Sequence, residues 1–324
     1  MEEEAIVRDE IDISKFEKKL SDLNLNKPIA IAPDDKLLDV LAIMQKNRIG
    51  SLMVTEGDKL VGILSERDLL LRVVGVVDNW RESTAGEVMT VNPMGLRSDE
   101  SVLSCLKIMA KKEFRHLPVL DEQGKLSHVL SINDILHFVV DLFPNLVEKF
   151  GTKVDWDVHA VEIYGENFSF GQDVENKHRM DSSIFLSPLS KAINPNKKML
   201  KMDVSSSCQE VLQQMRESKR GVVILTKFET EISGIITERD FLFKIFGKFN
   251  LKTDQLAAKD FMTPNPHTLL TKHIFAYAIN NMFTFRYRNI IIVNEDEFPI
   301  ALISLLDIFK YLSFYLFPED YQVE

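Results

Sequence analysis

Four aspartates follow a serine or threonine at the same spacing of three residues. These tetrads run from Ser65 to Asp68, Ser131 to Asp134, Thr237 to Asp240 and Ser304 to Asp307. A hydroxyl at a helix start accepts a hydrogen bond from a first-turn amide, and an acidic residue complements the positive helix end. A carboxylate there also suits a vicinal diol, because its two oxygens accept from both ribose hydroxyls. The tetrads alone leave both interpretations open.

Basic residues recur at a second fixed place. When the chain is aligned on Met44, Met109, Met215 and Met282, one column holds Gly50, Arg115, Gly221 and Arg288, and the column two residues earlier holds Arg48, Glu113, Lys219 and Arg286. The helix dipole alone favours cations at a helix end. Several cations at equivalent places, opposite equivalent aspartates, favour recognition of a diol and a phosphate together. A nucleotide is the simplest ligand of this kind.

The elements that must position these residues form a repeat. Before each tetrad lies an amphipathic helical pattern that ends in one of the four methionines, then an apolar strand, a turn and a second strand, as in "GSLMV" and "LVGIL". The tetrad then opens a second helix. Each unit therefore predicts a β-α-β-β-α order, and self-similarity of this kind determines the whole fold. The units that contain Asp68 and Asp134 are close together in the sequence and form one pair, and the units that contain Asp240 and Asp307 form another.

The segments between the units set the expected boundaries. Asn-Pro stops a helix and favours an extended chain in "EVMTVNPM" and "DFMTPNPH", which precede units two and four. We expect an N-terminal helical extension over 1–26, with Ile13, Phe16, Leu20 and Leu23 on one face, and an insertion over 143–183 with a hairpin pattern. The units are then 27–82, 83–142, 184–250 and 251–324.

Composition narrows the function classes. The formal net charge of −10 disfavours broad contacts with nucleic-acid phosphates or anionic lipid. Two cysteines without paired spacing indicate neither a disulfide framework nor a metal site, and they favour a reducing cytoplasm. The acidic start lacks a signal-peptide pattern. The apolar stretch Phe298 to Phe317 contains Asp307 and Lys310, so we expect no membrane span there. No nucleophile elbow or phosphate-binding glycine loop occurs, so we expect no enzyme activity.

With these motifs in hand, the chain resembles a tandem of four CBS (cystathionine-β-synthase-type) domains. The resemblance is carried by "GILSERD", "GIITERD", the "MT-x-NP" linkers and above all "FRHLPVLDEQGKLSHVLSINDIL" (Phe114 to Leu136). In that family two domains form a Bateman module that binds adenosyl ligands between its repeats. The resemblance implies an α/β (α+β) fold of two such modules in a flat disk. Four CBS domains without an enzyme domain are similar to the γ subunit of AMP-activated protein kinase.

The resemblance also implies roles for individual residues. Ribose would be held by Asp68, Asp134, Asp240 and Asp307, with the capping hydroxyls of Ser65, Ser131, Thr237 and Ser304 adjacent to the ligand. Phosphate would face Arg115, His116 and Arg288, with Arg48 or Lys219 reaching across, while Thr90 and Thr263 would frame adenine. Where units one and three have Gly62 and Gly234, units two and four have His128 and Ala301, which predicts narrower clefts and fewer than four occupied sites.

We therefore predict a non-catalytic regulatory protein, an energy sensor, that binds AMP, ADP or ATP without a required cofactor or metal. It would pass occupancy to an unknown protein effector, with the insertion and the N-terminal extension as partner surfaces, and repeat surfaces favour a homodimer. Three alternatives stay open: a structural scaffold or interaction protein whose tetrads only cap helices, a binder of S-adenosylmethionine or NAD, and a nucleotide hydrolase. Nucleic-acid binding is opposed by the charge.

Overall fold

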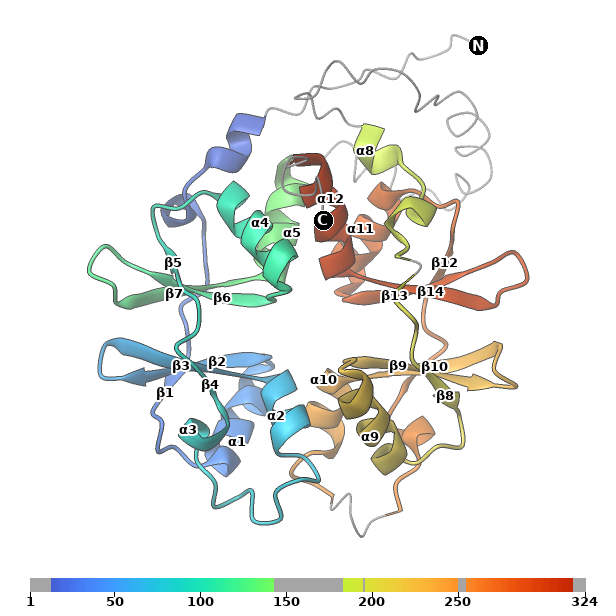
Figure 1. Cartoon of the computed structure of the whole chain (residues 1–324), viewed down its shortest axis with the longest axis horizontal. Helices are drawn as coiled ribbons and strands as arrows, with labels where there is room; N and C mark the ends of the chain where they lie inside the picture. The colour runs from blue at the N-terminus through green and yellow to red at the C-terminus, as the bar shows by residue number, and fades with distance from the viewer. Residues whose placement is uncertain (1–12, 143–182, 195, 250–254, 317–324) are drawn as a thin grey trace.

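The four predicted repeats are present in the computed structural model, which describes residues 13–142, 183–194, 196–249 and 255–316. Figure 1 shows the units around a common centre, viewed down the shortest axis of the molecule. Each contains a strand, a helix, an antiparallel hairpin and a second helix. The predicted mixed fold of β-α-β-β-α repeats is confirmed. Residues 143–182, with the predicted hairpin, lie outside the described residues.

Units one and two form the first module. Unit one consists of β1 (Ala30–Ile31), α1 (Leu37–Asn47), β2 (Ser51–Glu56), β3 (Lys59–Ser65) and α2 (Glu66–Arg72). Unit two consists of β5 (Leu96–Arg97), α4 (Val102–Lys112), β6 (His116–Leu120), β7 (Leu126–Ser131) and α5 (Ile132–Leu142). Between them lie α3 (Ala85–Val88) and β4 (Thr90–Val91).

Units three and four form the second module. Unit three consists of β8 (Lys201–Asp203), α9 (Cys208–Ser218), β9 (Val222–Lys227), β10 (Glu231–Thr237) and α10 (Glu238–Asp240), which continues as a π-helical turn, η4 (Phe241–Ile245). Unit four consists of β12 (Thr268–Leu270), α11 (Phe275–Phe285), β13 (Asn289–Val293), β14 (Pro299–Ser304) and α12 (Leu305–Leu316). The segment between them forms η5 (Ala258–Asp260) and β11 (Thr263–Pro264), and α8 (Ser183–Leu186) and η3 (Leu189–Ala192) precede unit three.

The first helix of every unit ends in the same way. Each is 11 residues long and is followed by a residue in the left-handed region: Arg48 (φ 53°), Glu113 (φ 58°), Lys219 (φ 54°) and Arg286 (φ 57°). This conformation stops a helix by redirecting the chain, although side chains other than glycine and asparagine disfavour it. The earlier column of the alignment is therefore the helix C-cap, which turns the chain into the hairpin.

The two linkers join the sheet of the unit that they leave. Strand β4 pairs antiparallel with β3, and β11 pairs antiparallel with β10. Residues Thr90 and Thr263 take equivalent places, opposite Ile63 and Ile235. The "MT-x-NP" stretches are extended at Thr90–Val91 and Thr263–Pro264. The prediction of an extended chain is wrong at the asparagines before the prolines, because Asn92 (φ 47°) and Asn265 (φ 46°) take positive φ values, which asparagine tolerates better than most residues. Units one and three therefore have four-stranded sheets, whereas units two and four have three strands each.

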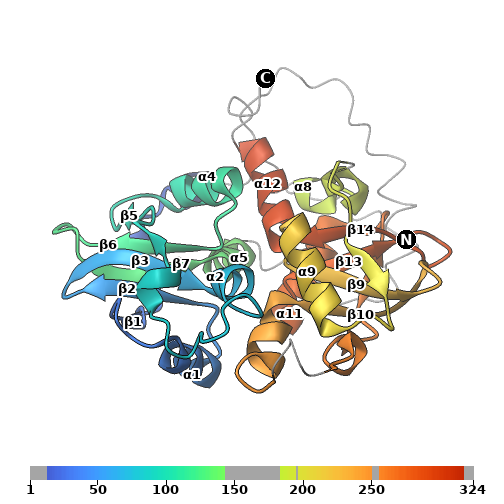
Figure 2. The same ribbon diagram turned by 60° about the horizontal axis from the view of Figure 1, so that its bottom comes forward.

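Sheets meet within a module, and helices meet between modules (Figures 1 and 2). In the second module, Ile224 and Ile235 of unit three pack with Ile291 and Val293 of unit four. One large apolar core joins the helices of units one and three, and another joins those of units two and four. Burying these faces removes apolar surface from water, which is the main favourable term in folding. The disk is therefore held by contacts in both directions.

The expectation of one helix over 1–26 is wrong for its described part. Residues Ile13–Glu17 (η1) and Leu20–Asp22 (η2) form two short 3₁₀ turns, separated by an antiparallel bridge between Lys19 and Ser101. Phe16 and Leu20 of the predicted apolar face are nevertheless buried in the core of units two and four, and Leu23 packs against it. Pairing with unit two thus replaces continuous helical hydrogen bonding.

The apolar stretch near the end of the described chain is divided between two elements. Strand β14 ends at Ser304, and helix α12 begins at Leu305. Both pack in the core of units two and four, where Ile303 and Phe309 are buried. Among the described residues, no helix has the length and apolar character needed to cross a membrane.

Candidate functional site

All four tetrads form the predicted cap at the start of the second helix. In unit one, the Ser65 amide and hydroxyl donate to Asp68 Oδ2 at 2.9 and 2.5 Å. In unit two, the Ser131 amide and hydroxyl donate to Asp134 Oδ2 at 2.6 and 2.7 Å. Equivalent bonds join Thr237 to Asp240, and Ser304 to Asp307. Each cap uses one aspartate oxygen, so the surroundings of the carboxylate decide whether it is available to a ligand.

The leading segment of each unit, the stretch just before its first strand, lies beside the aspartate of the other unit in its module. Thr90, leading into unit two, donates from Oγ1 to Asp68 Oδ1 of unit one at 3.1 Å. Asn26, leading into unit one, donates from Nδ2 to Asp134 Oδ1 of unit two at 3.5 Å. Each site thus combines residues from both units of a module.

The second module repeats this crossing with a charged residue. Lys197 leads into unit three, and its ammonium pairs with Asp307 Oδ2 of unit four. The alignment on Met44 and Met215 places Lys197 at the position of Asn26. One register position is therefore a neutral amide in the first module and a cation in the second.

The aspartates of units one and three are held by a cation on their own helix. Arg72 Nη2 lies 3.4 Å from Asp68 Oδ1, and Lys244 Nζ lies 2.7 Å from Asp240 Oδ1. Both cations also donate to linker carbonyls: Arg72 to Val88 and Met89, and Lys244 to Phe261. These side chains clamp each linker against its tetrad.

Asp134 is the exception among the four aspartates. Position i+4 after it is Phe138, and within the described parts of the chain no cation contacts its carboxylate. The one contact outside the cap, from the Asn26 amide at 3.5 Å, is at the outer limit of a hydrogen bond. A ribose would therefore have to displace weaker contacts at Asp134 than at the other three aspartates.

Glycine in units one and three makes room for methionine rather than for a ligand. A Cβ on Gly62 would overlap the Met89 sulfur, and a Cβ on Gly234 would overlap that of Met262. Both methionines belong to the linkers that return to these units. The expectation that glycine marks the wider clefts is therefore not supported, since side chains of the chain itself fill the space.

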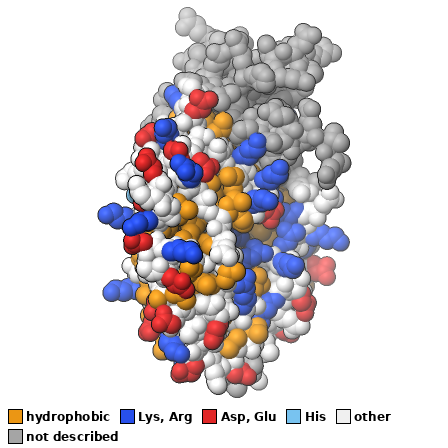
Figure 3. Space-filling view, turned by 60° about the vertical axis from the view of Figure 1, so that its left-hand side comes forward, with side chains coloured by type: hydrophobic (Ala, Val, Ile, Leu, Met, Phe, Trp, Pro, Cys, Tyr) orange, Lys and Arg blue, Asp and Glu red, His pale blue; other side chains and the backbone are white. Residues whose placement is uncertain are grey.

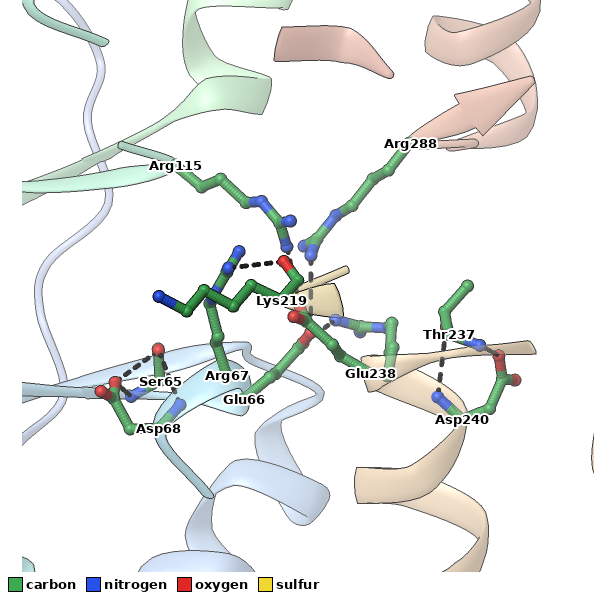
Figure 4. A network of polar contacts seen from close by, with 11 residues as sticks. Ser65, Glu66, Arg67, Asp68, Arg115, Lys219, Thr237, Glu238, Asp240 and Arg288 are labelled. Carbon is green, nitrogen blue, oxygen red and sulfur yellow. Dashed lines mark hydrogen bonds and ion pairs between the residues drawn. The ribbon is translucent and has the colours of Figure 1, made fainter. Parts of the chain in front are cut away.

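The arginines predicted to face phosphate meet glutamates at the centre of the disk (Figure 4). Arg115 Nη1 lies 2.9 Å from Glu238 Oε2, and Arg288 Nη1 lies 3.7 Å from Glu66 Oε2. Arg239, within the third tetrad, lies 2.9 Å from Glu66 Oε1. The glutamate side chains are only 6% and 4% exposed. These ion pairs join the two modules, and they bring Arg115 and Arg288 to the same glutamate network. Whether the two arginines face phosphate stays a prediction.

Glu66 and Glu238 were missed by the sequence analysis. Each follows a capping Ser or Thr, where an acidic residue is favoured by the helix end in any case. The signal that could have found them is that glycine at one position of a repeat accompanies glutamate at another position of the same repeat. A Cβ on Gly50 would lie 2.5 Å from Glu66 Oε1, and Gly221 makes the same room for Glu238. In units two and four the glycine column holds arginine, and the glutamate column holds Ile132 and Leu305.

That Arg48 and Lys219 reach toward phosphate stays a prediction, and the structure shows a role for their main chains. Their backbone carbonyls accept hydrogen bonds across the module boundary, Arg48 from Arg239 at 2.8 Å and Lys219 from Arg67 at 2.8 Å. Their own side chains form no hydrogen bond or ion pair with any other residue that the structure describes. Both are helix C-caps, so the main chain carries their structural role.

His116 lies among the arginines and is neutral at ordinary pH. Burial, followed by the charges of Arg288, Arg115 and Arg239, lowers its pKa to about 3. A neutral imidazole offers a phosphate one N–H but no positive charge. Burial also lowers the pKa of the Arg288 guanidinium from its ordinary value. His116 therefore brings no positive charge of its own to the arginines around it.

Comparison with protein families matches this architecture. A family model for the CBS domain matches residues 20–75, 85–141 and 191–247, more than half of the chain. Unit four lies outside these matches but has the same order of elements as the other three. The CBS domain-containing protein CBSCBSPB5 of Arabidopsis thaliana is 27% identical over 299 residues, covering 90% of this chain and 53% of that protein. The chain thus spans about half the length of this curated relative.

Two solved structures resemble this fold over most of the chain. Protein MJ1225 from Methanocaldococcus jannaschii, proposed as an archaeal homologue of g-AMPK, has a TM-score of 0.67 at 14% identity. The alignment covers 94% of this chain and 100% of that chain. An uncharacterized conserved protein from Pyrococcus horikoshii has a TM-score of 0.53 at 13% identity, with coverage of 90% and 98%. At such identities the likeness shows the fold alone.

Proposed function

The chain belongs to the CBS-domain family, and from this premise we propose that it is a regulatory protein that binds an adenine nucleotide of the AMP, ADP or ATP class between units one and two, with the ribose on Asp134. The observation that carries the proposal is the state of that carboxylate. Arg72, Lys244 and Lys197 contact the other three aspartates, whereas a neutral amide contacts Asp134. A ribose diol would replace one weak hydrogen bond rather than an ion pair.

The surroundings of Asp134 suit the remaining parts of a nucleotide. The leading segment beside it carries Ile29, a large hydrophobic side chain that is 37% exposed. Figure 3 shows hydrophobic side chains gathered across the middle of the first-module side, with lysine and arginine side chains to one side of them. An apolar surface suits the face of an adenine ring. Arg115 is tied to the same helix end, because its carbonyl accepts from the Ile132 amide at 2.9 Å.

Binding there would act by fixing how two units lie relative to each other. A ligand that contacts Asp134 and the leading segment of unit one bridges both halves of the first module. The ligand changes the binding of a protein effector only if it binds one arrangement of the two units more tightly than another. Arg115 extends this coupling, since its side chain reaches Glu238 of the second module.

Thermal unfolding of the ligand-stripped chain tests the proposal. The panel is adenosine, AMP, ADP, ATP, NAD, S-adenosylmethionine and a cyclic dinucleotide. A ligand at a hundred times its dissociation constant is expected to stabilise the fold by about 2.7 kcal/mol. A raised unfolding temperature with the AMP, ADP or ATP class supports the proposal. A response to S-adenosylmethionine or NAD alone would favour those ligands, and no response to the panel would favour a scaffold in which the tetrads only cap helices.

A further inference from the structure

Glu66 and Glu238 have no counterpart in the family-based assignment of roles, yet they are the most buried charged side chains at the centre of the disk. They start the second helices of units one and three, next to the capping residues Ser65 and Thr237. Figure 4 shows both side chains directed toward the centre, where Arg115 and Arg288 come down from the other two units. Arg115 Nη1 donates to the Glu238 carboxylate at 2.9 Å, and Arg288 Nη1 lies 3.7 Å from Glu66 Oε2.

The chain is built to admit these carboxylates in two units only. Gly50 and Gly221 leave the space that the carboxylates fill, and a methyl group there would lie 2.5 Å from either one. Units two and four supply arginine instead, and each arginine pairs with the glutamate of the other module. The arrangement is therefore a cross-pairing of all four units rather than a chance surface contact.

The charges in this network do not cancel. Three arginines, Arg115, Arg239 and Arg288, face the two carboxylates of Glu66 and Glu238. An anion is favoured here, but its place at Arg115 is taken by Glu238 at 2.9 Å. A phosphate that binds Arg115 must replace this charge-assisted hydrogen bond with its own.

We propose that Glu66 and Glu238 are specificity-determining residues that stand in for ligand phosphate on the central arginines, so that a nucleotide phosphate binds Arg115 only by displacing Glu238. This rests on the proposed function and deepens it. The glutamate lowers the affinity for phosphorylated ligands but not for adenosine. Displacement also breaks an ion pair between the modules, which links phosphate binding to the contact between them.

Binding of adenosine, AMP and ATP to the wild-type chain and to Glu238→Gln tests the proposal. The glutamine keeps the shape but removes the competing charge, so the affinity for AMP is expected to rise about tenfold, and that for ATP by at least as much. The affinity for adenosine is expected to stay within about twofold. Arg115 is 37% exposed, so it is not left buried without a partner. Equal changes for adenosine and AMP, or no change for either, would overturn the proposal.

Two matched variants accompany this measurement. Glu66→Gln makes the same change at the equivalent position, but Glu66 pairs with Arg239 and Arg288 rather than Arg115, so a smaller effect on AMP is expected. Glu238→Asp keeps the charge but shortens the side chain away from Arg115, and it is expected to raise the AMP affinity in the same direction as glutamine. A Glu66→Gln effect as large as that of Glu238→Gln would contradict the assignment to Arg115.

Inorganic phosphate gives a readout that does not need adenosine binding. Phosphate is expected to raise the unfolding temperature of Glu238→Gln more than that of the wild type, because the Arg115 guanidinium, no longer paired with a carboxylate, can bind the anion. If no variant binds adenosine or AMP, the proposed function fails, and the phosphate measurement still decides the role of Glu238. Equal shifts in both proteins would show that the glutamate does not occupy an anion site.

Discussion

Asn26 and Lys197 lie at the same register position of the two modules, each beside the tetrad aspartate of the following unit. Asn26 Nδ2 is 3.5 Å from Asp134 Oδ1, whereas the Lys197 ammonium forms an ion pair with Asp307. The two modules share a fold and a capping arrangement, so this position is a local difference with a direct effect on the carboxylate. Under the proposed function, the first module is the better site for a ribose, whereas the aspartate of the second is paired with a cation.

Exchanging these residues is expected to exchange the behaviour of the modules. Lys197→Asn removes the cation from Asp307, whose side chain is 14% exposed. The stoichiometry of AMP in a calorimetric titration is then expected to rise from one to two per chain. A titration that still ends at one equivalent would show that Lys197 is not what closes the second site.

The reciprocal change is expected to close the first site. Asn26→Lys places an ammonium beside Asp134, and a charged donor competes with neutral ribose hydroxyls for the carboxylate. AMP affinity is expected to fall at least tenfold, while the unfolding temperature without ligand stays equal or rises. Asn26→Gln, which lengthens the side chain without charge, is the control and is expected to weaken binding less.

His116 makes the fold sensitive to acid. Its pKa is about 3 in the folded chain, below the ordinary value of 6.5, so the unfolded chain binds more protons between these values. The stability that this neutral imidazole contributes is therefore present above the unfolded pKa and is lost as the pH falls. Between pH 7 and 5 the loss is at most about 2 kcal/mol.

Comparing His116→Gln with the wild type isolates this term. The unfolding temperature of the variant is expected to fall less than that of the wild type between pH 7 and 5. Between pH 7 and 8 the unfolding temperatures of the two proteins should change in parallel. Parallel behaviour over the whole range would mean that His116 titrates alike in the folded and unfolded chains.

Gly62 is expected to be needed for packing rather than for ligand access. An added methyl group meets the Met89 side chain, so Gly62→Ala should cost about 1 to 3 kcal/mol of stability through overpacking. Denaturant unfolding measures the loss. Shortening the methionine in the double variant Gly62→Ala/Met89→Ala should give coupling between the two changes. Additive losses would show that the two side chains do not compete for this space.

Local patterns in the sequence were sufficient for the fold. The amphipathic helices, the hairpins and the tetrads each depend on residues a few positions apart, and the structure has them in all four units. The continuous N-terminal helix was wrong, because Lys19 pairs with Ser101 of unit two, a contact that helical periodicity does not reveal.

The site was predictable only in part, since its partners are far apart in the chain. The tetrads gave the capping aspartates, but Arg115 and Glu238 are 123 positions apart, and Asn26 and Asp134 are 108 apart. Nothing local distinguishes a glutamate that starts a helix from one that neutralises an arginine of another unit. Comparison of the four repeats did hold a signal. Units one and three have glycine together with glutamate, whereas units two and four have arginine together with isoleucine or leucine at the same two positions.

Titration of the ligand-stripped chain with AMP, for the wild type and for Asp134→Ala and Asp307→Ala, tests the central claim most directly. Both variants lose the same kind of helix cap, at about 1 kcal/mol each, and Asp307→Ala also loses the ion pair with Lys197. The unfolding temperature without ligand is therefore measured for each variant, so that a loss of AMP affinity is separated from a loss of folding. We expect one AMP per wild-type chain, binding at least tenfold weaker in Asp134→Ala, and affinity within about twofold of wild type in Asp307→Ala. Undiminished binding in Asp134→Ala, or binding lost only in Asp307→Ala, would contradict the account.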